Sequence, residues 1–147
     1  MAGRDVEALV SLRRRQFEEA ERRLAQLNGE LARIASRIAA LKEEFGATAL
    51  PSSGSGLALG AVAAQRRAWR ALLAELERRR AEVTALREEA REALRAAHVA
   101  LEQAKSLEAE ALKRRLRRLN RQETAAIDEL AAGRFWQLRR NAEGREL

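Results

Sequence analysis

Between residues 4 and 45 the apolar side chains are separated alternately by four and three positions, which is the heptad repeat of a coiled coil. The repeat has one polar member, Arg13, and it is long enough to predict a single helix over about residues 4–45 that pairs with another helix. Its members are Val6, Val10, Arg13, Phe17, Ala20, Leu24, Leu27, Leu31, Ile34, Ile38, Leu41 and Phe45.

The composition changes abruptly after this repeat. Residues 46–60 contain no charged side chain, four of the eight glycines and the only proline, Pro51, which is typical of a turn between helices. No proline follows, so a second helix is predicted over about residues 61–140. Its expected apolar positions are Val62, Trp69, Leu72, Leu76, Val83, Leu86, Ala90, Ala93 and Ala97.

Residues 1–147 therefore form one predicted domain of the all-α class, a two-helix antiparallel coiled-coil hairpin with a longer, overhanging second helix. At about 1.5 Å per residue the two helices would span about 60 and about 120 Å. Folding back about the middle of the turn places Phe45 near residue 60 and Val6 near residue 99. The second helix beyond about Ala100 is then expected to lack an intramolecular partner.

The predicted overhang has two different faces. At 100° per residue its leucines and isoleucine share one side and most of its bases share the other, whereas Arg115 falls outside the basic stripe. An amphipathic stripe left in water marks an interaction site. The apolar side holds Leu112, Leu116, Leu119, Ile127 and Leu130, and the basic side holds Lys113, Arg114, Arg117, Arg118 and Arg121.

Catalysis has no support in the sequence. The chain has no cysteine, His98 is its only histidine, and the glycines at 54, 56 and 60 lack the strand and the Gly-Lys-Ser/Thr signature of a phosphate loop. We therefore expect no enzyme activity, no cofactor and no metal. The membrane is not expected to be spanned, because no apolar run approaches about 20 residues, and the charged N-terminus excludes an ordinary secretory signal. A cytoplasmic protein is expected.

Two other groups of residues have alternative interpretations. The run Arg13–Arg15 contacts either phosphates or, as we favour, the acids Glu88, Glu89 and Glu92 across the hairpin. The cluster of Phe135, Trp136 and Leu138 is equally compatible with a docking motif and with a frayed helix end.

Three functional classes remain open on the residues alone. The net charge of +7 and the basic stripe suit a nucleic-acid-associated rod, although acids alternate with bases elsewhere and no stacking aromatics accompany the stripe. The same stripe could lie on a membrane surface, but its apolar face is narrow. An adaptor or stalk that presents the overhang to protein partners needs neither feature.

The layout resembles the FliJ family of flagellar export proteins over essentially the whole chain. Residues 105–115 and 121–134 follow the closing pattern of that family, a charged stretch that leads to a hydrophobic residue, Asp-Glu, another hydrophobic residue and Ala. The most specific match is the group Arg121, Gln122, Glu123, Ile127, Asp128, Glu129 and Ala131, and a second match is Leu72, Leu73, Leu76 and Glu77. The scarcity of aromatic residues departs from the family.

The resemblance implies a stalk that inserts into and stimulates the hexameric flagellar export ATPase, FliI in that family, and that contacts the export gate FlhA and export chaperones. It implies a location at the inner face of the cell membrane without membrane insertion, and no nucleic-acid partner. A stalk protein of a virulence type III secretion system, as in the related YscO proteins, has the same architecture and stays as the alternative.

Two sets of contact residues follow from the resemblance together with the faces described above. The expected ATPase-ring contact comprises Lys113, Arg114, Leu116, Arg117, Arg118, Leu119, Arg121, Gln122, Glu123, Asp128 and Glu129. The expected gate or chaperone contact lies near the turn and comprises Leu41, Phe45, Trp69, Leu72 and Leu76, which could equally fill the space between the helices.

Overall fold

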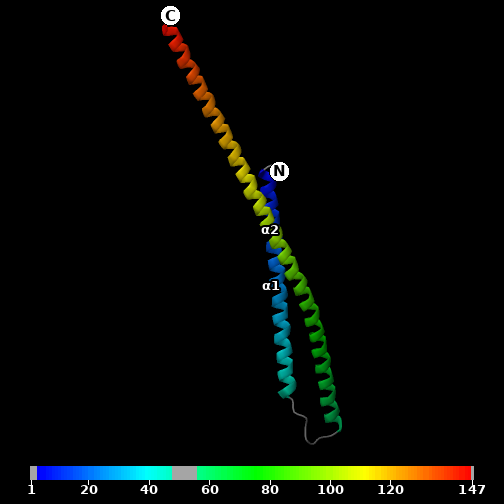
Figure 1. The fold of residues 1–147 in the computed structure, drawn as a ribbon. Coiled ribbons are helices and arrows are strands. Elements are labelled where there is room, and N and C mark those ends of the chain that lie inside the picture. The colour runs from blue at the N-terminus through cyan, green and yellow to red at the C-terminus, as the bar shows by residue number, and fades with distance from the viewer. Residues whose placement is uncertain (1–2, 48–55, 147) are drawn as a thin grey trace. The chain divides into compact units, whose positions relative to one another are not determined.

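The computed structural model describes residues 3–47 and 56–146, and all of them are helical. The first helix, α1, spans Gly3–Ala47 and the second, α2, spans Gly56–Glu146, as Figure 1 shows. No strand occurs within these two ranges. The all-α class and the helical hairpin expected from the sequence are thus confirmed.

Both helices are longer than the sequence suggested. Residues 56–60, expected in the turn, form the start of α2, and residues 141–146, expected beyond its end, continue it. Leu57, Ala58 and Leu59 explain the first difference, because leucine and alanine are strong helix formers that outweigh the two flanking glycines. The rest of the expected turn, residues 48–55, lies outside the described residues.

The chain divides into two compact units, and the larger comprises residues 13–100. Its core is a cluster of five buried side chains, with Leu24, Leu31, Leu73, Leu76 and Leu86 packed around it. The two helices run antiparallel here, since Phe17 meets His98 and Phe45 meets Trp69. The buried members of the cluster are Leu27, Ile34, Ile38, Val83 and Ala90.

The heptad positions predicted in α1 face α2. Each of the twelve is buried or half-buried, and this includes the polar Arg13, whereas the residues between them are mostly exposed. The 4–3 spacing of the sequence therefore identified the packing face of α1 correctly.

The packing face of α2 differs from the prediction at two positions. Leu72 and Ala93 are exposed, and their neighbours Leu73 and Leu94 are half-buried instead. The observed packing positions alternate by four and three residues without a break. Several of them are charged, so the repeat cannot be recognised from apolar residues alone. It comprises Val62, Arg66, Trp69, Leu73, Leu76, Arg80, Val83, Arg87, Ala90, Leu94, Ala97, Leu101, Ala104, Glu108 and Ala111, all at least half-buried except Arg80.

The register of the hairpin also differs from the expected one. Phe45 lies against Trp69 and not near residue 60, because α2 begins further from the paired region than α1 ends (Figure 1). The expected register assumed a symmetric turn. Apolar matching between the two helices determines the register instead, since sliding one helix along the other would take each packing side chain out of the hole that receives it.

The smaller unit comprises residues 1–12 and 101–147. Val6 and Val10 of α1 and Leu101 and Ala104 of α2 are buried in it, each at most 6% exposed. From residue 112 to residue 145 every described side chain is exposed. The overhang predicted from Ala100 is therefore real, but it begins at about residue 112.

Candidate partner-binding surface

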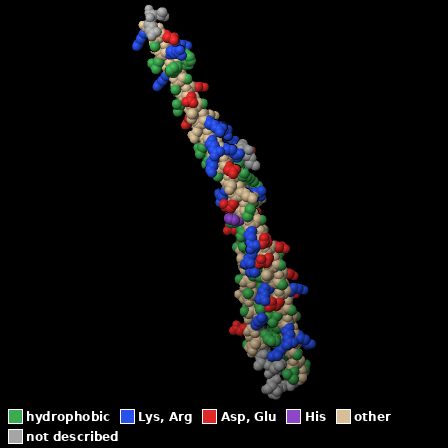
Figure 2. Space-filling model, in the orientation of Figure 1, with side chains coloured by type: hydrophobic (Ala, Val, Ile, Leu, Met, Phe, Trp, Pro, Cys, Tyr) green, Lys and Arg blue, Asp and Glu red, His purple; other side chains and the backbone are tan. Residues whose placement is uncertain are grey.

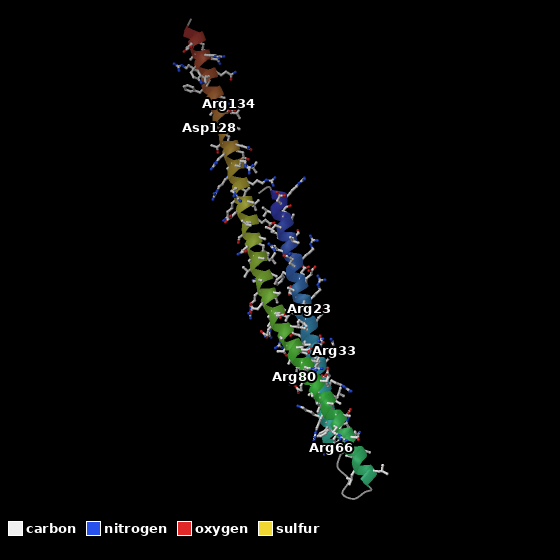
Figure 3. The ribbon with its side chains drawn as sticks, turned by 90° about the vertical axis from the view of Figure 1, so that its right-hand side faces the viewer. Arg23, Arg33, Arg66, Arg80, Asp128 and Arg134 are labelled. Atoms are coloured by element: carbon white, nitrogen blue, oxygen red, sulfur yellow. The ribbon has the colours of Figure 1, made fainter. Side chains whose placement is uncertain are left out.

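The exposed part of α2 displays a row of large apolar side chains. Their exposed fractions run from 47% for Leu119 to 70% for Leu130, although leucine is normally among the most buried residue types. In Figure 3 this stretch, which carries the labelled Asp128 and Arg134, has no second helix beside it. The row comprises Leu112, Leu116, Leu119, Ile127 and Leu130.

A basic stretch covers the first three turns of the same segment. Figure 2 shows Lys and Arg side chains gathered on α2 near the start of α1. Residues 113–121 contain six bases and no acid, and none of the six forms an ion pair within the described part of the chain. These bases are Lys113, Arg114, Arg115, Arg117, Arg118 and Arg121.

Bases in the larger unit are placed differently. Arg80 pairs with Glu77, Arg91 with Glu88, and both pairs are three residues apart on one helix. Hydrogen bonding to Glu75 raises the pKa of the exposed Arg78 above its ordinary value. The basic stretch lacks such acids, so its positive charge is available to another molecule.

An acidic stretch follows immediately. Residues 122–133 contain Glu123, Asp128 and Glu129 and no lysine or arginine. Residues 113–133 are therefore divided along their length into a cationic stretch and an anionic stretch. The eleven residues expected at the ATPase ring all lie in this segment, and all are exposed.

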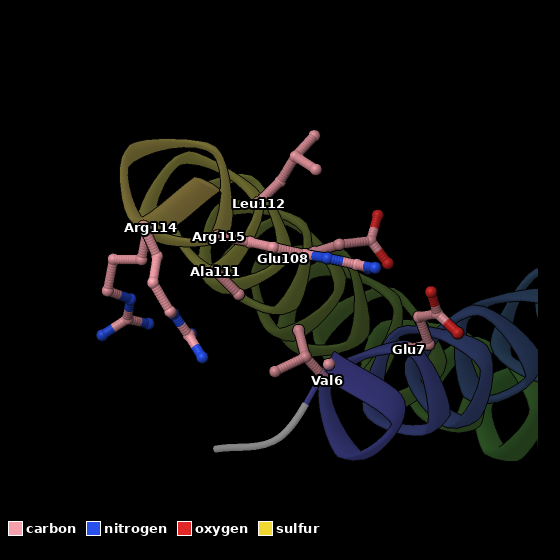
Figure 4. A pocket seen from close by; sticks show the side chains of 9 residues that line it. Val6, Glu7, Glu108, Ala111, Leu112, Arg114 and Arg115 are labelled. Atoms are coloured by element: carbon pink, nitrogen blue, oxygen red, sulfur yellow. The ribbon is translucent and has the colours of Figure 1, made fainter. Parts of the chain in front are cut away.

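A hollow of about 800 Å³ lies in the smaller unit, between the start of α1 and the basic stretch. Its lining includes the apolar Val6 and Ala111 and the carboxylates of Glu7 and Glu108 (Figure 4). Glu108 and Arg115 extend on the same side of α2, whereas Arg114 points away from them (Figure 4). The remaining lining residues are Gly3, Leu112 and Arg118.

Most of the residues expected to contact the gate or a chaperone lie between the two helices and not on their surface. Leu41 is 2% exposed, and Leu76 packs against the core cluster. The rings of Phe45 and Trp69 meet edge-on with centroids 5.6 Å apart. Leu72 is the exposed member of the five, at 39%. The structure thus unites four of these residues in the packing face and leaves Leu72 on the surface.

The predicted ion pairs between Arg13–Arg15 and the acids of α2 are wrong. Arg13 donates to Gln16 Oε1 at 3.0 Å, Glu88 pairs with Arg91 on its own helix, and Glu92 pairs with Arg95. The shifted register explains this result, because it moves those acids away from the start of α1.

One ion pair that crosses between the helices joins Arg79 to Glu30, with Nη2 and Oε1 2.6 Å apart. Hydrogen bonding to Glu30 raises the pKa of Arg79 above its ordinary value. The sequence analysis missed this pair, although both residues flank the packing face, where coiled coils commonly carry charge pairs.

The other residues considered in the sequence were His98 and the glycines at 54, 56 and 60. His98 is exposed and lies against Phe17 beside the packing face, with ring centroids 5.7 Å apart. Gly56 and Gly60 are helical, and Gly54 lies outside the described residues. Within residues 3–47 and 56–146 no three metal-ligating side chains gather, and neither helix is long and apolar enough to cross a membrane.

Comparison with known proteins identifies a family. The family model of the flagellar FliJ protein matches residues 3–140, which is nearly the whole chain. No curated protein and no solved structure matches it.

Proposed function

The chain belongs to the FliJ family and is thus a component of flagellar protein export, and from this we propose that it is the central stalk of the export ATPase. In this role the exposed end of α2 enters the hexameric ring of a FliI-like ATPase and stimulates ATP hydrolysis. The stalk itself needs no catalytic residue, as FliJ is a non-enzymatic export family.

The observation that carries this proposal is the face of α2 that α1 leaves uncovered. Residues 112–130 present exposed leucines beside bases that form no ion pair in the described part of the chain. Such a surface is suited to being covered when a partner binds. A single copy of an asymmetric hairpin cannot obey sixfold symmetry, so it would contact the six subunits unequally. Unequal contacts bias the subunits toward different states, as a rotary stalk requires.

Charge reversal tests the ring contact directly. Replacing Arg114, Arg117, Arg118 and Arg121 by Glu is expected to weaken ring association and ATPase stimulation while the helical content is unchanged, because all four side chains are exposed. A matched control reverses four exposed arginines of α1, namely Arg14, Arg15, Arg22 and Arg23. Normal stimulation by the α2 variant would refute the assignment.

A second contact, with an FlhA-like gate or an export chaperone, belongs to the end of the hairpin where α2 begins. Leu72 supports this contact because its apolar side chain is 39% exposed. It lies three residues along α2 from Trp69, which pairs with Phe45. We expect Leu72→Asp to reduce export without lowering stability, whereas Trp69→Ala lowers stability as well. Unchanged export by Leu72→Asp would leave these residues with a packing role alone.

These contacts would hold the protein at the inner face of the cell membrane without inserting it. The alternative role, as stalk of a virulence secretion system, predicts the same contacts with a different ATPase. Deletion of the gene distinguishes the two, since loss of motility is expected for the flagellar role only.

A further inference from the structure

The exposed apolar row of α2 is not a continuation of the face that packs against α1. The α1-facing repeat ends at Ala111, and continuing it would select Arg115 and Arg118. The exposed leucines begin one residue later, at Leu112, so their face is rotated by about 100°. An extension of the α1 packing cannot cover that face, and it requires a different helix.

The exposed row has a heptad spacing of its own. Four of its members fall on a heptad with Glu123 and Ala126, whereas Ile127 lies beside it: Leu112, Leu116, Leu119, Glu123, Ala126 and Leu130 are separated by four, three, four, three and four residues. This is the pattern of a coiled-coil strand, with one acidic member. The helix that covers this face should therefore carry a matching repeat.

The distribution of charge identifies which helix that is. Residues 113–121 hold six bases and no acid, and residues 122–133 hold three acids and no base. A parallel copy of the same segment would place bases against bases. An antiparallel copy places the basic half of each helix against the acidic half of the other, twice, which is the self-complementary arrangement of a twofold dimer.

The antiparallel register then follows from the repeat itself. In an antiparallel pair the residue number rises along one helix and falls along the other, so facing residues have a constant sum. If Leu112 faces Leu130 of the second copy, that sum is 242, and Leu116 then faces Ala126 of the second copy. Each contact occurs twice by symmetry. Nearest the twofold axis, Glu123 faces Leu119 of the second copy. This layer is unfavourable because it places a carboxylate against an apolar side chain, and it limits the affinity of the dimer.

Flanking residues, whose positions add to 244 because they pair two positions off the facing layers, agree with the same register. Arg115, which lies outside the basic stripe, is placed beside Glu129 of the second copy, and the symmetry repeats this pair. Gln122 would meet its own symmetry mate near the axis, where two neutral amides can pair with each other. Neither position brings like charges together.

We propose that two copies of this chain associate reversibly through an antiparallel coiled coil of residues 112–130. The dimer covers Leu116 and Leu119, which the proposed ring contact also needs. A chain paired with a second copy is therefore unavailable to the ATPase, and binding to the ring releases it from the dimer. The self-association does not depend on the proposed function.

Sedimentation over a concentration series of the full chain tests the association. The wild-type protein is expected to pass from monomer to dimer below about 100 μM. Leu130→Asp places a second charge in the interface and should abolish the dimer, whereas the control Leu138→Asp, on an outward position of the same helix, should leave it unchanged. A wild-type chain that stays monomeric, or a Leu130→Asp dimer, overturns the proposal.

Charge exchange tests the antiparallel pairing. Arg115→Glu creates two like-charge contacts with Glu129 and is expected to weaken the dimer by about tenfold. Adding Glu129→Arg should restore it, and Arg114→Glu, an outward substitution, should not affect it. Failure of the double variant to recover would refute this register.

Cross-linking tests the orientation, and it is simple because the natural chain has no cysteine. A short bis-maleimide should join Leu112→Cys chains to Leu130→Cys chains in a mixture and join neither variant to itself. A parallel dimer would give the opposite result. Sedimentation and cross-linking are measured on the chain alone, without an ATPase, so failure of the dimer and failure of the stalk role give separate results.

Discussion

The ring of Phe45 meets the ring of Trp69 edge-on, with centroids 5.6 Å apart and planes inclined by 68°. The guanidinium of Arg66 lies 5.4 Å from the centre of the Phe45 ring. Aromatic pairs prefer this geometry, and a cation over the ring adds to it. The cluster links α1 and α2 near the end of the hairpin and defines their register there.

Removal of this contact should destabilise the hairpin. We expect Trp69→Ala to lower the free energy of unfolding by about 2–4 kcal/mol, since it removes a large half-buried side chain. Trp136→Ala serves as the control, because Trp136 is 57% exposed and should change the stability by less than about 0.5 kcal/mol. Urea denaturation followed by circular dichroism measures both.

A charge at the centre of the core should unfold the hairpin. Leu27 is 2% exposed within the core cluster, so Leu27→Asp would bury an unpaired carboxylate and is expected to cost about 3–5 kcal/mol. The less buried Leu31→Asp should have the same effect at a smaller magnitude. Ala25→Asp on the exposed side of α1 is the control, and equal losses at positions 25 and 27 would contradict the packing.

Gly29 offers a stabilising substitution. A Cβ added there would meet only Nη1 of Arg33, at 3.6 Å, which is an ordinary contact with a flexible side chain. Gly29→Ala should therefore raise the free energy of unfolding by about 0.5–1 kcal/mol through helix propensity. Thermal melts report the change, and a lower melting temperature would show a clash that the geometry does not contain.

The ion pair between Arg79 and Glu30 should respond to salt but not to moderate alkali. Hydrogen bonding to Glu30 raises the pKa of Arg79, so the stability from this group is complete below the ordinary arginine pKa and is lost only as the pH rises through the higher folded-state value. Between about pH 6 and 9 the melting temperature should not change through Arg79. Glu30→Gln should lower it slightly, and less so at high salt.

Nucleic acid provides a test of the competing functional class. A phosphate-binding rod would bind duplex or single strands without a protein partner, with an affinity that falls steeply between about 50 and 200 mM salt. We expect only weak binding that disappears near physiological salt. Tight binding under those conditions, without any association with an export ATPase, would contradict the stalk role.

The sequence predicted the packing face of α1 more accurately than that of α2. Every heptad position of α1 except Arg13 is apolar, so the repeat is visible without a structure. In α2 the corresponding positions include Arg66, Arg80 and Arg87, whose long apolar stems can pack while their charged ends reach water. Composition alone therefore favoured Leu72 over its neighbour Leu73.

The start of the overhang was predicted about twelve residues too early for a related reason. A turn has no repeat from which its geometry can be read, so the fold-back point was assigned to the middle of residues 46–60. The register depends instead on long-range matches such as Phe45 with Trp69, which local patterns do not contain. The amphipathic character of residues 112–130 depends on their own spacing alone and was predicted correctly.

The change of phase between Ala111 and Leu112 makes the length of α2 a functional variable. Deletion of one residue at this junction would rotate the exposed leucines by about 100° and align them with the side that α1 occupies. Insertion of seven residues would leave both orientations nearly unchanged and only move the surfaces apart. Indels at this point should therefore be tolerated in whole heptads and rejected as single residues, although no side chain would have changed its chemistry.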